Sequence, residues 1–350
     1  MSTDPEHFSS PISHLPSPIS DSSRRAVIDI GTNSVKLLVA DVSPAAVEPV
    51  WEGSEQTRLG RGFYDDHRLR PDAIADTARA VAEFSQTARE QGATHLRVIA
   101  TSAARDAVNA GELLAAVAAA SGVAAEVISG EQEADWAFQG VLTDDSLGSQ
   151  PVLILDVGGG STEFILGHAG RALFRDSFKL GTVRLLEAAR LADPPTSAEL
   201  AASRAQLRAF LDREVRPKLA PHLAALNLDQ SAEHRSAGTV EPSNAEQCSA
   251  LQLVGTGGTT SILARLELQL ADYDRDRIEA TRFTADRLRW HVERLWHLPL
   301  AERRTLPGLP PKRADVILFG AAIYEAVMEG FGLAELRVST RGLRFAAVRP

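Results

Sequence analysis

Apolar residues recur along the chain at two spacings, the short period typical of strands and the three-to-four-residue period typical of helices. The first half opens with two β-rich runs joined by a turn of Gly, Asn and Ser, which predicts a hairpin. In chain order, the expected elements are a hairpin over Arg25–Val42, a helix after Pro71, a strand at Leu96–Ala100, a helix at Gly111–Ala120, a strand at Ala125–Ile128 and a helix at Glu131–Leu142. This alternation predicts an α/β fold.

The second half begins by repeating the plan of the opening. Pro151–Asp156 and Ser161–Gly167 again read as a strand, an aspartate, a glycine turn, hydroxyl residues and a returning strand. Asp29–Ser34 and Asp156–Thr162 therefore form a weak internal repeat. The later elements expected are helices over Gly181–Ala225, a polar surface loop at Ser231–Gln247, a strand at Leu251–Val254, a helix ending near Leu270, a helix capped by Thr284, a helix at Lys312–Met328 and a strand at Leu336–Ser339.

Length and composition divide the chain into two folded parts. A chain of 350 residues with 44% hydrophobic and 24% charged residues fits a globular protein of two domains. Residues 1–23 are dominated by Ser and Pro and predict a disordered tail, because they offer little apolar surface to offset the entropy of ordering. We expect a first domain over residues 24–148 and a second over residues 149–350, with helical insertions.

Charge and cysteine usage exclude several partners. A net charge of -9 argues against broad nucleic-acid binding, which requires basic surfaces. The N-terminus does not read as a secretory signal, and no apolar run is long enough to span a bilayer. Cys248 is the one cysteine and cannot form an internal disulfide. We expect a cytoplasmic protein without membrane or nucleic-acid partners.

Three turns rich in Gly and hydroxyl residues each follow a predicted strand. They lie at Asp29–Ser34, Asp156–Thr162 and Gly255–Thr260. Backbone N–H groups in such turns can surround a phosphate without obstruction by side chains. One such turn alone is more often only a tight turn. Three in one chain, two of them preceded by a buried aspartate, favour a phosphate-binding site.

Asp29 and Asp156 end hydrophobic strands, where burial of a carboxylate costs free energy unless it has a partner. A divalent cation beside phosphates is one such partner, and the hydrogen bonds of the turn itself are the alternative. The alternative is weaker for Asp156, because Glu163 in the returning strand can face the same pocket. The sequence lacks the Gly-Lys pair of a P-loop, the complete glycine pattern of a dinucleotide fingerprint and the paired histidines of a zinc protease.

Several motifs together resemble the exopolyphosphatase/guanosine pentaphosphatase family. The order and spacing also fit, and the likeness runs from about Arg25 to Arg344. The motifs are Asp-x-Gly-Thr-Asn-Ser at Asp29–Ser34, Ala-Thr-Ser-Ala-Ala-Arg-Asp-Ala at Ala100–Ala107, Ser-Gly-x-x-Glu-Ala at Ser129–Ala134, Asp-Val-Gly-Gly-Gly-Ser-Thr-Glu at Asp156–Glu163, and Lys179-Leu-Gly-Thr-Val-Arg184.

The resemblance implies a fold and a set of site residues. The fold is that of the actin, sugar kinase and chaperone ATPase superfamily: two ribonuclease-H-like domains of mixed sheet with flanking helices and an active site in the cleft between them. Glu133 matches the glutamate that activates water, and Arg105 would grip phosphate oxygens. The phosphate-binding positions are Thr32, Asn33, Ser34, Gly158, Gly159, Gly160, Ser161 and Thr162. Asp156 and Glu163, together with Asp29, would hold Mg²⁺.

The implied activity is that of a short-form exopolyphosphatase, a hydrolase that removes the terminal phosphate of inorganic polyphosphate. A guanosine pentaphosphate phosphohydrolase and a noncatalytic polyphosphate or alarmone sensor are the alternatives, with a kinase of the same superfamily as a further rival. The resemblance also implies a homodimer. Lys179, Arg184 and Arg313 are equally well explained as guides for a polyanion or as surface and ion-paired residues.

Overall fold

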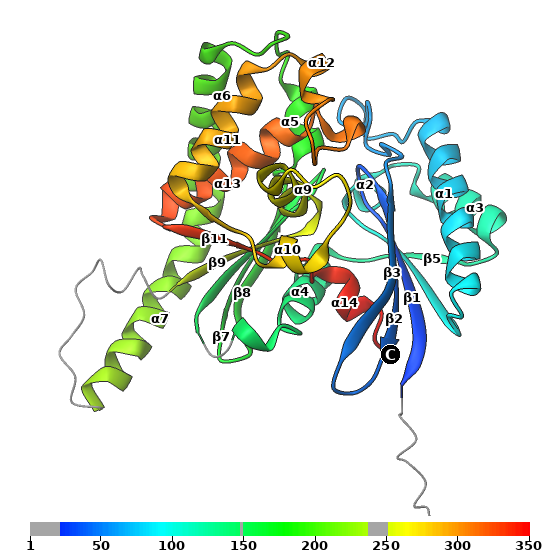
Figure 1. Ribbon diagram of the computed structural model, residues 1–350, viewed down its shortest axis with the longest axis horizontal. Coiled ribbons are helices and arrows are strands. Elements are labelled where there is room, and N and C mark those ends of the chain that lie inside the picture. Colours follow the sequence, from blue (N-terminus) through cyan, green and yellow to red (C-terminus); the bar gives the residue numbers. More distant parts are fainter. Residues whose placement is uncertain (1–21, 148–149, 237–250) are drawn as a thin grey trace, which may run out of the picture.

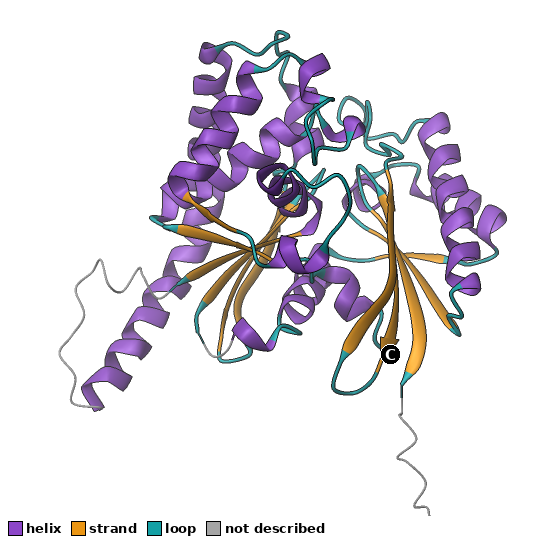
Figure 2. Ribbon diagram, in the orientation of Figure 1, coloured by secondary structure: helices purple, strands orange, loops and turns teal. Residues whose placement is uncertain are grey.

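The computed structural model describes residues 22–147, 150–236 and 251–350. Two sheets, each covered by helices, stand side by side as two α/β domains (Figures 1 and 2). The expected fold class of two mixed sheets with flanking helices is therefore confirmed. Residues 1–21 of the expected tail lie outside the described part, and Ser23 already begins the first strand.

The first sheet is built around the predicted hairpin. Strand β1 pairs antiparallel with β2 and parallel with β4, so a mixed sheet forms. In spatial order its strands are β3 (Val47–Glu55), β2 (Val35–Val42), β1 (Ser23–Ile30), β4 (His95–Ala100) and β5 (Ala125–Val127). Helices α1 (Pro71–Glu90) and α3 (Ala110–Ser121) bury their apolar residues against one face of this sheet, and the short α2 (Ser102–Asp106) follows β4.

The second sheet repeats this topology. Strand β6 pairs antiparallel with β7 and parallel with β9, just as β1 pairs with β2 and β4. In spatial order its strands are β10 (Arg282–Thr284), β11 (Glu335–Val338), β9 (Gln252–Thr256), β6 (Val152–Val157), β7 (Thr162–His168) and β8 (Arg171–Phe178). The weak sequence repeat therefore corresponds to two copies of one strand plan.

Helices form the outer layer of the second domain. Most of these helices contribute side chains to a single apolar core on one face of the second sheet. The helices of this domain are α5 (Thr182–Ala188), α6 (Ser197–Phe210), α7 (Arg216–Ser236), α9 (Gly257–Leu268), α10 (Arg275–Glu279), α11 (Ala285–His297), α12 (Leu300–Arg303) and α13 (Ile317–Phe331). Thr284 accepts a hydrogen bond from the Arg287 N–H and caps α11, as the sequence predicts.

Two helices lie between the sheets. Helix α4 (Gly130–Val141) packs Ala137 and Phe138 against the second sheet. Helix α14 (Leu343–Ala347) follows the last strand of the second sheet but inserts Phe345 into a core with the first sheet. Gly140 and Gly342 touch where these helices meet, so a side chain at Gly140 would overlap the Gly342 carbonyl. The last residues of the chain thus tie the two domains together (Figure 1).

Two further features qualify the sequence interpretation. The loop expected at Ser231–Gln247 is wrong for its first residues, because α7 continues to Ser236, and the remainder lies outside the described part. Within the described ranges, none of the helices combines the length and the apolar character needed to cross a bilayer.

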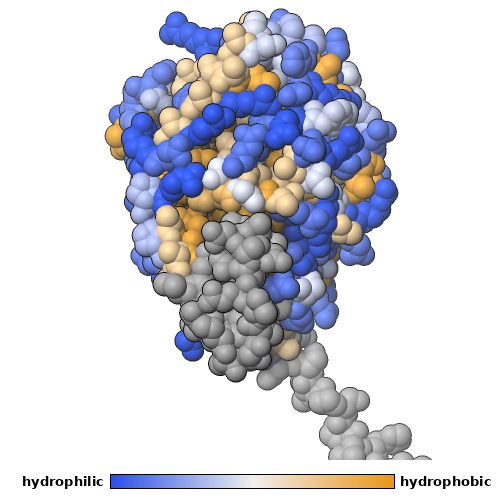
Figure 3. Space-filling view, turned by 90° about the vertical axis from the view of Figure 1, so that its left-hand side faces the viewer, coloured by the Kyte–Doolittle hydropathy of each residue, from blue (hydrophilic) through white to orange (hydrophobic). Residues whose placement is uncertain are grey.

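The outer surface of the helical layer is mostly polar. Seen from the second domain, hydrophilic side chains dominate and apolar areas are small (Figure 3). Trp290 of α11 is one exposed aromatic side chain, with 43% of its surface accessible, and the Arg287 guanidinium stacks on its ring at 4.0 Å.

Candidate active site

The two predicted phosphate turns have the same backbone geometry. In the first, the Gly31 N–H donates to the Ser34 carbonyl at 3.0 Å. In the second, the Gly158 N–H donates to the Ser161 carbonyl, also at 3.0 Å. Each turn joins the two antiparallel strands that begin its domain. Both turns are therefore closed by the same hydrogen bond at the same place in their hairpins.

These turns meet across the domain boundary. Gly160 is packed so closely that an added Cβ would lie 2.8 Å from the Thr32 Oγ1 and would overlap Ser102. At Gly159 an added Cβ would lie 3.0 Å from the Thr32 Cβ. The Thr32 side chain thus fills the space that the two glycines leave open. The two halves of the sequence repeat are brought face to face, as the hydrolytic interpretation requires.

Buried polar groups of the first turn lack protein partners. Both side-chain amide atoms of Asn33 and the Oδ1 of Asp29 are buried without a hydrogen bond. Thr32 and Ser34 are also buried. Because buried polar atoms are normally satisfied by protein, water or ligand, this turn is suited to hold a polar ligand.

Asp29 and Asp156 form an acidic pair with a common cation. Burial raises the pKa of each carboxyl, and Lys36 opposes that rise in both. Asp29 also acts on Asp156 and raises its pKa further. The two carboxylates are therefore close enough to interact electrostatically, although they come from different domains.

Glu133 occupies the first turn of α4. The Ser129 side chain accepts the Gln132 N–H and caps the helix, which places Glu133 near the positive end of the helix dipole. The Arg105 Nη1 lies 3.0 Å from the Glu133 Oε2. Burial, together with the nearby Asp29 and Asp156, raises the pKa of Glu133 to about 7 against the lowering effect of Arg105. Such a carboxyl can change protonation state near neutral pH.

Glu163 and Thr162 are held inside the second domain. Glu163 is 1% exposed, and the Ser177 hydroxyl donates to its Oε1 at 2.7 Å. Burial raises the pKa of Glu163 well above its ordinary value, and Glu133 and Asp156 raise it further. The Thr162 hydroxyl donates to the Leu180 carbonyl, so this predicted phosphate-binding side chain is already engaged in the core.

Magnesium fits only part of the predicted ligand set. Carboxylate oxygens are the donors that Mg²⁺ prefers, and the unpartnered Oδ1 of Asp29 beside Asp156 offers them. Across the described ranges, no group of three or more His, Cys, Asp or Glu side chains is placed to hold a metal. Glu163 is instead bonded to Ser177. The donors present suit an ion held by one or two carboxylates together with phosphate and water oxygens.

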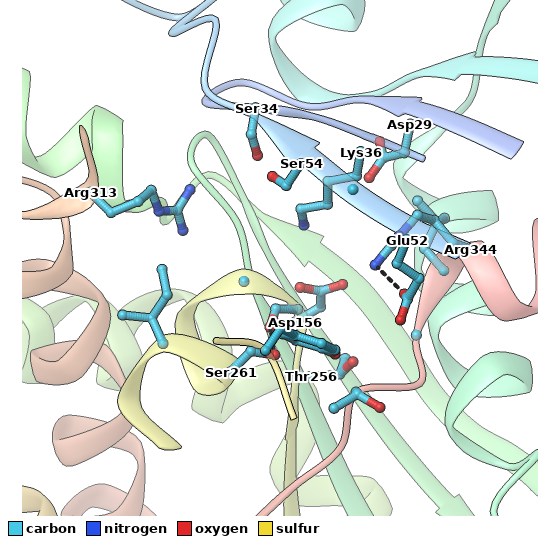
Figure 4. A pocket seen from close by; sticks show the side chains of 18 of the residues that line it. Asp29, Ser34, Lys36, Glu52, Ser54, Asp156, Thr256, Ser261, Arg313 and Arg344 are labelled. Atoms are coloured by element: carbon cyan, nitrogen blue, oxygen red, sulfur yellow. Dashed lines mark hydrogen bonds and ion pairs between the residues drawn. The ribbon is translucent and has the colours of Figure 1, made fainter. Parts of the chain in front are cut away.

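Two cavities flank the meeting point of the turns. One, of about 430 Å³, is lined by Asp29, Ser34, Lys36, Asp156 and Arg313 among others (Figure 4). The other, of about 490 Å³, is lined by Ser102, Arg105, Ser161, Ser177 and Lys179 among others. The predicted site residues that line a cavity are therefore divided between two spaces, with Asp29, Ser34 and Asp156 at the first and Arg105 and Ser161 at the second.

Comparison with known proteins assigns the chain to a family. The model of the Ppx/GppA phosphatase family matches residues 38–345. The chain belongs to the Ppx/GppA phosphatase family. It is thus an enzyme, a hydrolase of phosphorus-containing anhydrides. The predicted resemblance is confirmed.

Individual members of the Ppx/GppA family agree over nearly the whole length. Exopolyphosphatase 2 of Mycobacterium tuberculosis is 34% identical over 330 residues, which cover 90% of this chain and 94% of that protein. Among solved structures, an exopolyphosphatase-like protein is 26% identical with a TM-score of 0.79, covering 94% of this chain and 97% of that one. The Aquifex aeolicus PPX-GPPA enzyme is 28% identical with a TM-score of 0.70, covering 93% and 98% of the two chains.

The sequence did not decide the roles of three basic residues, and each has different surroundings in this Ppx/GppA phosphatase. Arg184 donates to the Gly160 carbonyl at 3.0 Å and stacks on the Tyr64 ring at 4.2 Å, so it supports the second turn. Lys179 is exposed at the second cavity. Arg313 is buried at the first cavity.

Sequence reasoning missed four residues of the site: Lys36, Tyr64, Ser102 and Ser177. Lys36 carried a usable signal, because it stands opposite Asp29 in the first hairpin just as Glu163 stands opposite Asp156 in the second. Ser177 lies in β8 and Tyr64 in the long connection after β3, and neither position belongs to the repeated turn. Their roles depend on contacts that only the folded chain makes.

Proposed function

We propose that this phosphatase is a magnesium-dependent exopolyphosphatase, which hydrolyses the terminal phosphoanhydride bond of inorganic polyphosphate and releases orthophosphate. The observation that carries the proposal is Glu133, a carboxyl that is 12% exposed, lies 3.0 Å from Arg105 and has its pKa raised to about 7, in part by Asp29 and Asp156 of the two phosphate turns. The name of the mycobacterial relative and the match to the family support the substrate class.

Glu133 would act as the general base. In its ionised form the carboxylate accepts a proton from a water molecule, which then attacks the terminal phosphorus in line with the leaving phosphate. Arg105 holds the carboxylate at 3.0 Å and can also donate to a phosphate oxygen, since its guanidinium carries several donors. A base positioned in this way contributes about 10²- to 10⁴-fold to the rate.

The two turns would hold the terminal phosphate. Gly159 and Gly160 of the second turn have no side chains of their own to obstruct their backbone N–H groups, and both side-chain amide atoms of Asn33 in the first turn are buried without a hydrogen bond. Bound magnesium would supply positive charge that stabilises the leaving phosphate. Asp156 and Asp29 are the residues that would hold it.

Guanosine pentaphosphate is the second candidate substrate. The first cavity is favourable to a nucleoside because apolar and aromatic side chains, among them Ile262, Tyr273 and Phe345, line it beside the acidic pair. A noncatalytic sensor is disfavoured, because binding alone gives no reason to keep an acid with a pKa near neutrality at the meeting point of the turns.

Phosphate release from three substrates tests these alternatives. Purified protein is incubated with tripolyphosphate, long-chain polyphosphate and guanosine pentaphosphate, with magnesium or with a chelator. We expect release from polyphosphate that depends on magnesium. Release from guanosine pentaphosphate alone would replace the proposal with the second candidate, and tight binding without any release would support a sensor.

We also propose that the enzyme works as a cytoplasmic homodimer, as the family resemblance implies. Light scattering coupled to gel filtration measures the mass of the particle in solution. A mass near twice the 37.6 kDa of one chain supports the dimer, whereas the mass of one chain would contradict it.

A further inference from the structure

Helix α5 holds the carbonyl groups of the second phosphate turn. Its first three residues, Thr182–Arg184, bond in order to the carbonyls of Gly158, Gly159 and Gly160. The first two donate their backbone N–H groups, at 3.0 and 2.9 Å, and the third donates the Nε of its side chain, at 3.0 Å. Three successive carbonyls of the turn therefore face α5.

The same bonds decide where the N–H groups of the turn point. These peptide bonds are trans, so the N–H of each residue points opposite to the carbonyl of the residue before it. The N–H groups of Gly159, Gly160 and Ser161 are thus directed away from α5. The Gly158 N–H, by contrast, closes the turn on the Ser161 carbonyl. Ser161 lines the second cavity with Arg105, so the direction of its N–H matters for a ligand held there.

The Gly160 carbonyl differs from the other two because a side chain holds it. Arg184 has several rotatable bonds, so its guanidinium keeps one position only where its surroundings fix it. Two groups of the first domain do so: the Asp106 Oδ2 lies 3.4 Å from its Nη2, and the centre of the Tyr64 ring lies 4.2 Å from its Cζ. An added Cβ on Gly160 would lie 2.8 Å from the Tyr64 hydroxyl. Tyr64 therefore lies beside both the arginine and the turn.

The chain segment that carries Tyr64 is attached to both halves of the site. It lies in the connection between β3 and α1. The Gly60 N–H donates to the Thr32 carbonyl of the first turn at 2.7 Å, and the Gly62 N–H donates to the Glu187 carboxylate of α5. Tyr64 is therefore held between the first turn and α5, where an aromatic ring can orient a guanidinium.

We propose that Tyr64 is a positioning residue for the reaction, because its ring holds the Arg184 guanidinium on the Gly160 carbonyl. The bond to that carbonyl directs the Ser161 N–H toward the phosphate held by the two turns. The inference rests on the proposed exopolyphosphatase function, in which this group is the terminal phosphate of the substrate. Backbone donors fixed in advance stabilise the charge of a transferring phosphoryl group without reorganisation during the reaction. In this role Tyr64 acts through Arg184 and donates nothing to the substrate itself.

Two substitutions of Tyr64 test the role of its ring. Phosphate release is measured with tripolyphosphate and magnesium. Tyr64→Leu removes the ring, and we expect kcat/KM to fall about tenfold because the guanidinium is no longer held. Tyr64→Phe keeps the ring and should stay within about twofold of the wild type. A wild-type rate for Tyr64→Leu would overturn the proposal. So would equal losses in both variants, because the hydroxyl and not the ring would then be responsible.

Arg184→Gln tests whether Tyr64 acts through Arg184. Alone, it should lower kcat/KM more than Tyr64→Leu does, because it removes the donor to the Gly160 carbonyl. Tyr64→Leu added to Arg184→Gln should cause no further loss, as expected for two residues that act as a unit. If the two losses multiply in the double variant, Tyr64 acts independently and the proposal is wrong.

Trp290→Leu is the matched control, because it removes a ring on which an arginine, Arg287, stacks at 4.0 Å on the outer helix α11. Its rate should equal that of the wild type. A loss as large as that of Tyr64→Leu would show that the effect is not specific to the turns, against the proposal. Circular dichroism and thermal unfolding show whether each protein is folded. Tyr64→Met gives the same comparison if Tyr64→Leu does not fold.

Calorimetric binding separates the positioning role from the proposed function. Tripolyphosphate is titrated into the Glu133→Gln protein with and without Tyr64→Leu, and we expect Kd to rise when the ring is removed. Absence of phosphate release by the wild-type protein from any polyphosphate would refute the exopolyphosphatase function, whereas a rise in Kd would still support the positioning role. Normal release by the wild type, together with unchanged kcat/KM and Kd on removal of the ring, would refute the positioning role and leave that function standing.

Discussion

The two hairpins that begin the domains share a backbone but differ in charge. In the first, Asp29 pairs across the strands with Lys36, a cation. In the second, Asp156 pairs at the equivalent position with Glu163, another acid. The first domain therefore brings its own counter-ion to the site, whereas the second accumulates carboxyl groups. The repeated strand plan is therefore asymmetric in charge at this pair of positions.

The turns themselves differ in a complementary way. Where the first turn carries Thr32 and Asn33, the second carries Gly159 and Gly160. The side chain of Thr32 packs against the two glycines, so the first turn provides a side chain and the second provides the space that receives it. Because each turn supplies what the other lacks, neither turn alone would form the site.

The largest effect is expected from Glu133, the carboxyl that both hairpins influence. Glu133→Gln keeps the size of the side chain but removes the proton acceptor. We expect phosphate release to fall by about 10²- to 10⁴-fold, the usual contribution of a positioned base. The measurement is kcat with polyphosphate and magnesium, after circular dichroism has shown that the fold is intact.

Glu131→Gln is the control for this change, because Glu131 lies in the same turn of α4 but is 74% exposed and paired with Arg175. Its activity should stay near that of the wild type. Equal activity in both variants would remove Glu133 from the role of base.

A smaller loss is expected when the complementarity of the turns is broken. Gly160→Ala places a methyl group against Thr32, Ser102 and Tyr64 and pushes the second turn away from the first. Displacement of reacting groups by about 1 Å can cost on the order of 10²-fold in rate. We expect a loss of this size in kcat with little change in secondary structure.

Gly111→Ala provides the comparison for Gly160→Ala, because nothing lies within 4 Å of an added Cβ at Gly111. This variant in helix α3 should retain full activity and at least wild-type stability. Full activity of Gly160→Ala would show that the fit between the turns is not needed for catalysis.

Local sequence signals predicted the repeated hairpins, because both depend on short apolar strands and a turn. Other features had no such signal. Strand β3 is an edge strand containing Pro49, and it is specified by backbone pairing to β2 rather than by its own pattern. The return of Phe345 to the first domain depends on contacts between residues far apart in the chain. Long-range contacts of this kind are not encoded in local periodicity.

The site was predicted where residue type and turn position coincide. Asp29 and Asp156 could be found in this way, whereas Glu133 was identified by the resemblance of Ser129–Ala134 to a family motif. The hydroxyl of Thr162 was predicted to bind phosphate, but the orientation of a strand side chain toward Leu180 depends on what packs beside it. The charge difference between Lys36 and Glu163 was visible in the alignment of the two hairpins, and its meaning became clear once both were placed in one site.

The pH dependence of the rate tests how Glu133 is influenced by both hairpins. Burial raises its pKa to about 7, with Asp29 and Asp156 adding to the rise. Only the ionised carboxylate accepts a proton, so kcat/KM should increase with pH up to about 7 and then level off. Below that point we expect about a tenfold loss per pH unit. A rate that stays constant from pH 5 to pH 8 would contradict this assignment.

The smallest effects are expected on the unfolding temperature. Substitutions at Glu163 and Lys36, which occupy equivalent positions in the two hairpins, should shift it in opposite directions. The pKa of Glu163 is raised in the folded protein, chiefly by burial, so its stabilising contribution is present at low pH and is lost as pH rises through the folded pKa. Glu163→Gln should therefore unfold at a higher temperature than the wild type at pH 8, and the difference should vanish toward pH 4.

Lys36→Gln should behave in the opposite way. It removes the stronger of the two cations that act on Asp29 and Asp156, the other being Arg344, and this matters most at high pH, where both carboxyls are ionised. We expect a Tm lower than that of the wild type at pH 8, by about 1–2 °C for each kcal/mol of stability lost, since the unfolding entropy of a chain of 350 residues is large. Differential scanning calorimetry from pH 4 to pH 8 measures both variants. If they shift Tm in the same direction at pH 8, the two hairpins do not differ in electrostatic role, because the sign of the shift follows from the charge opposite each aspartate.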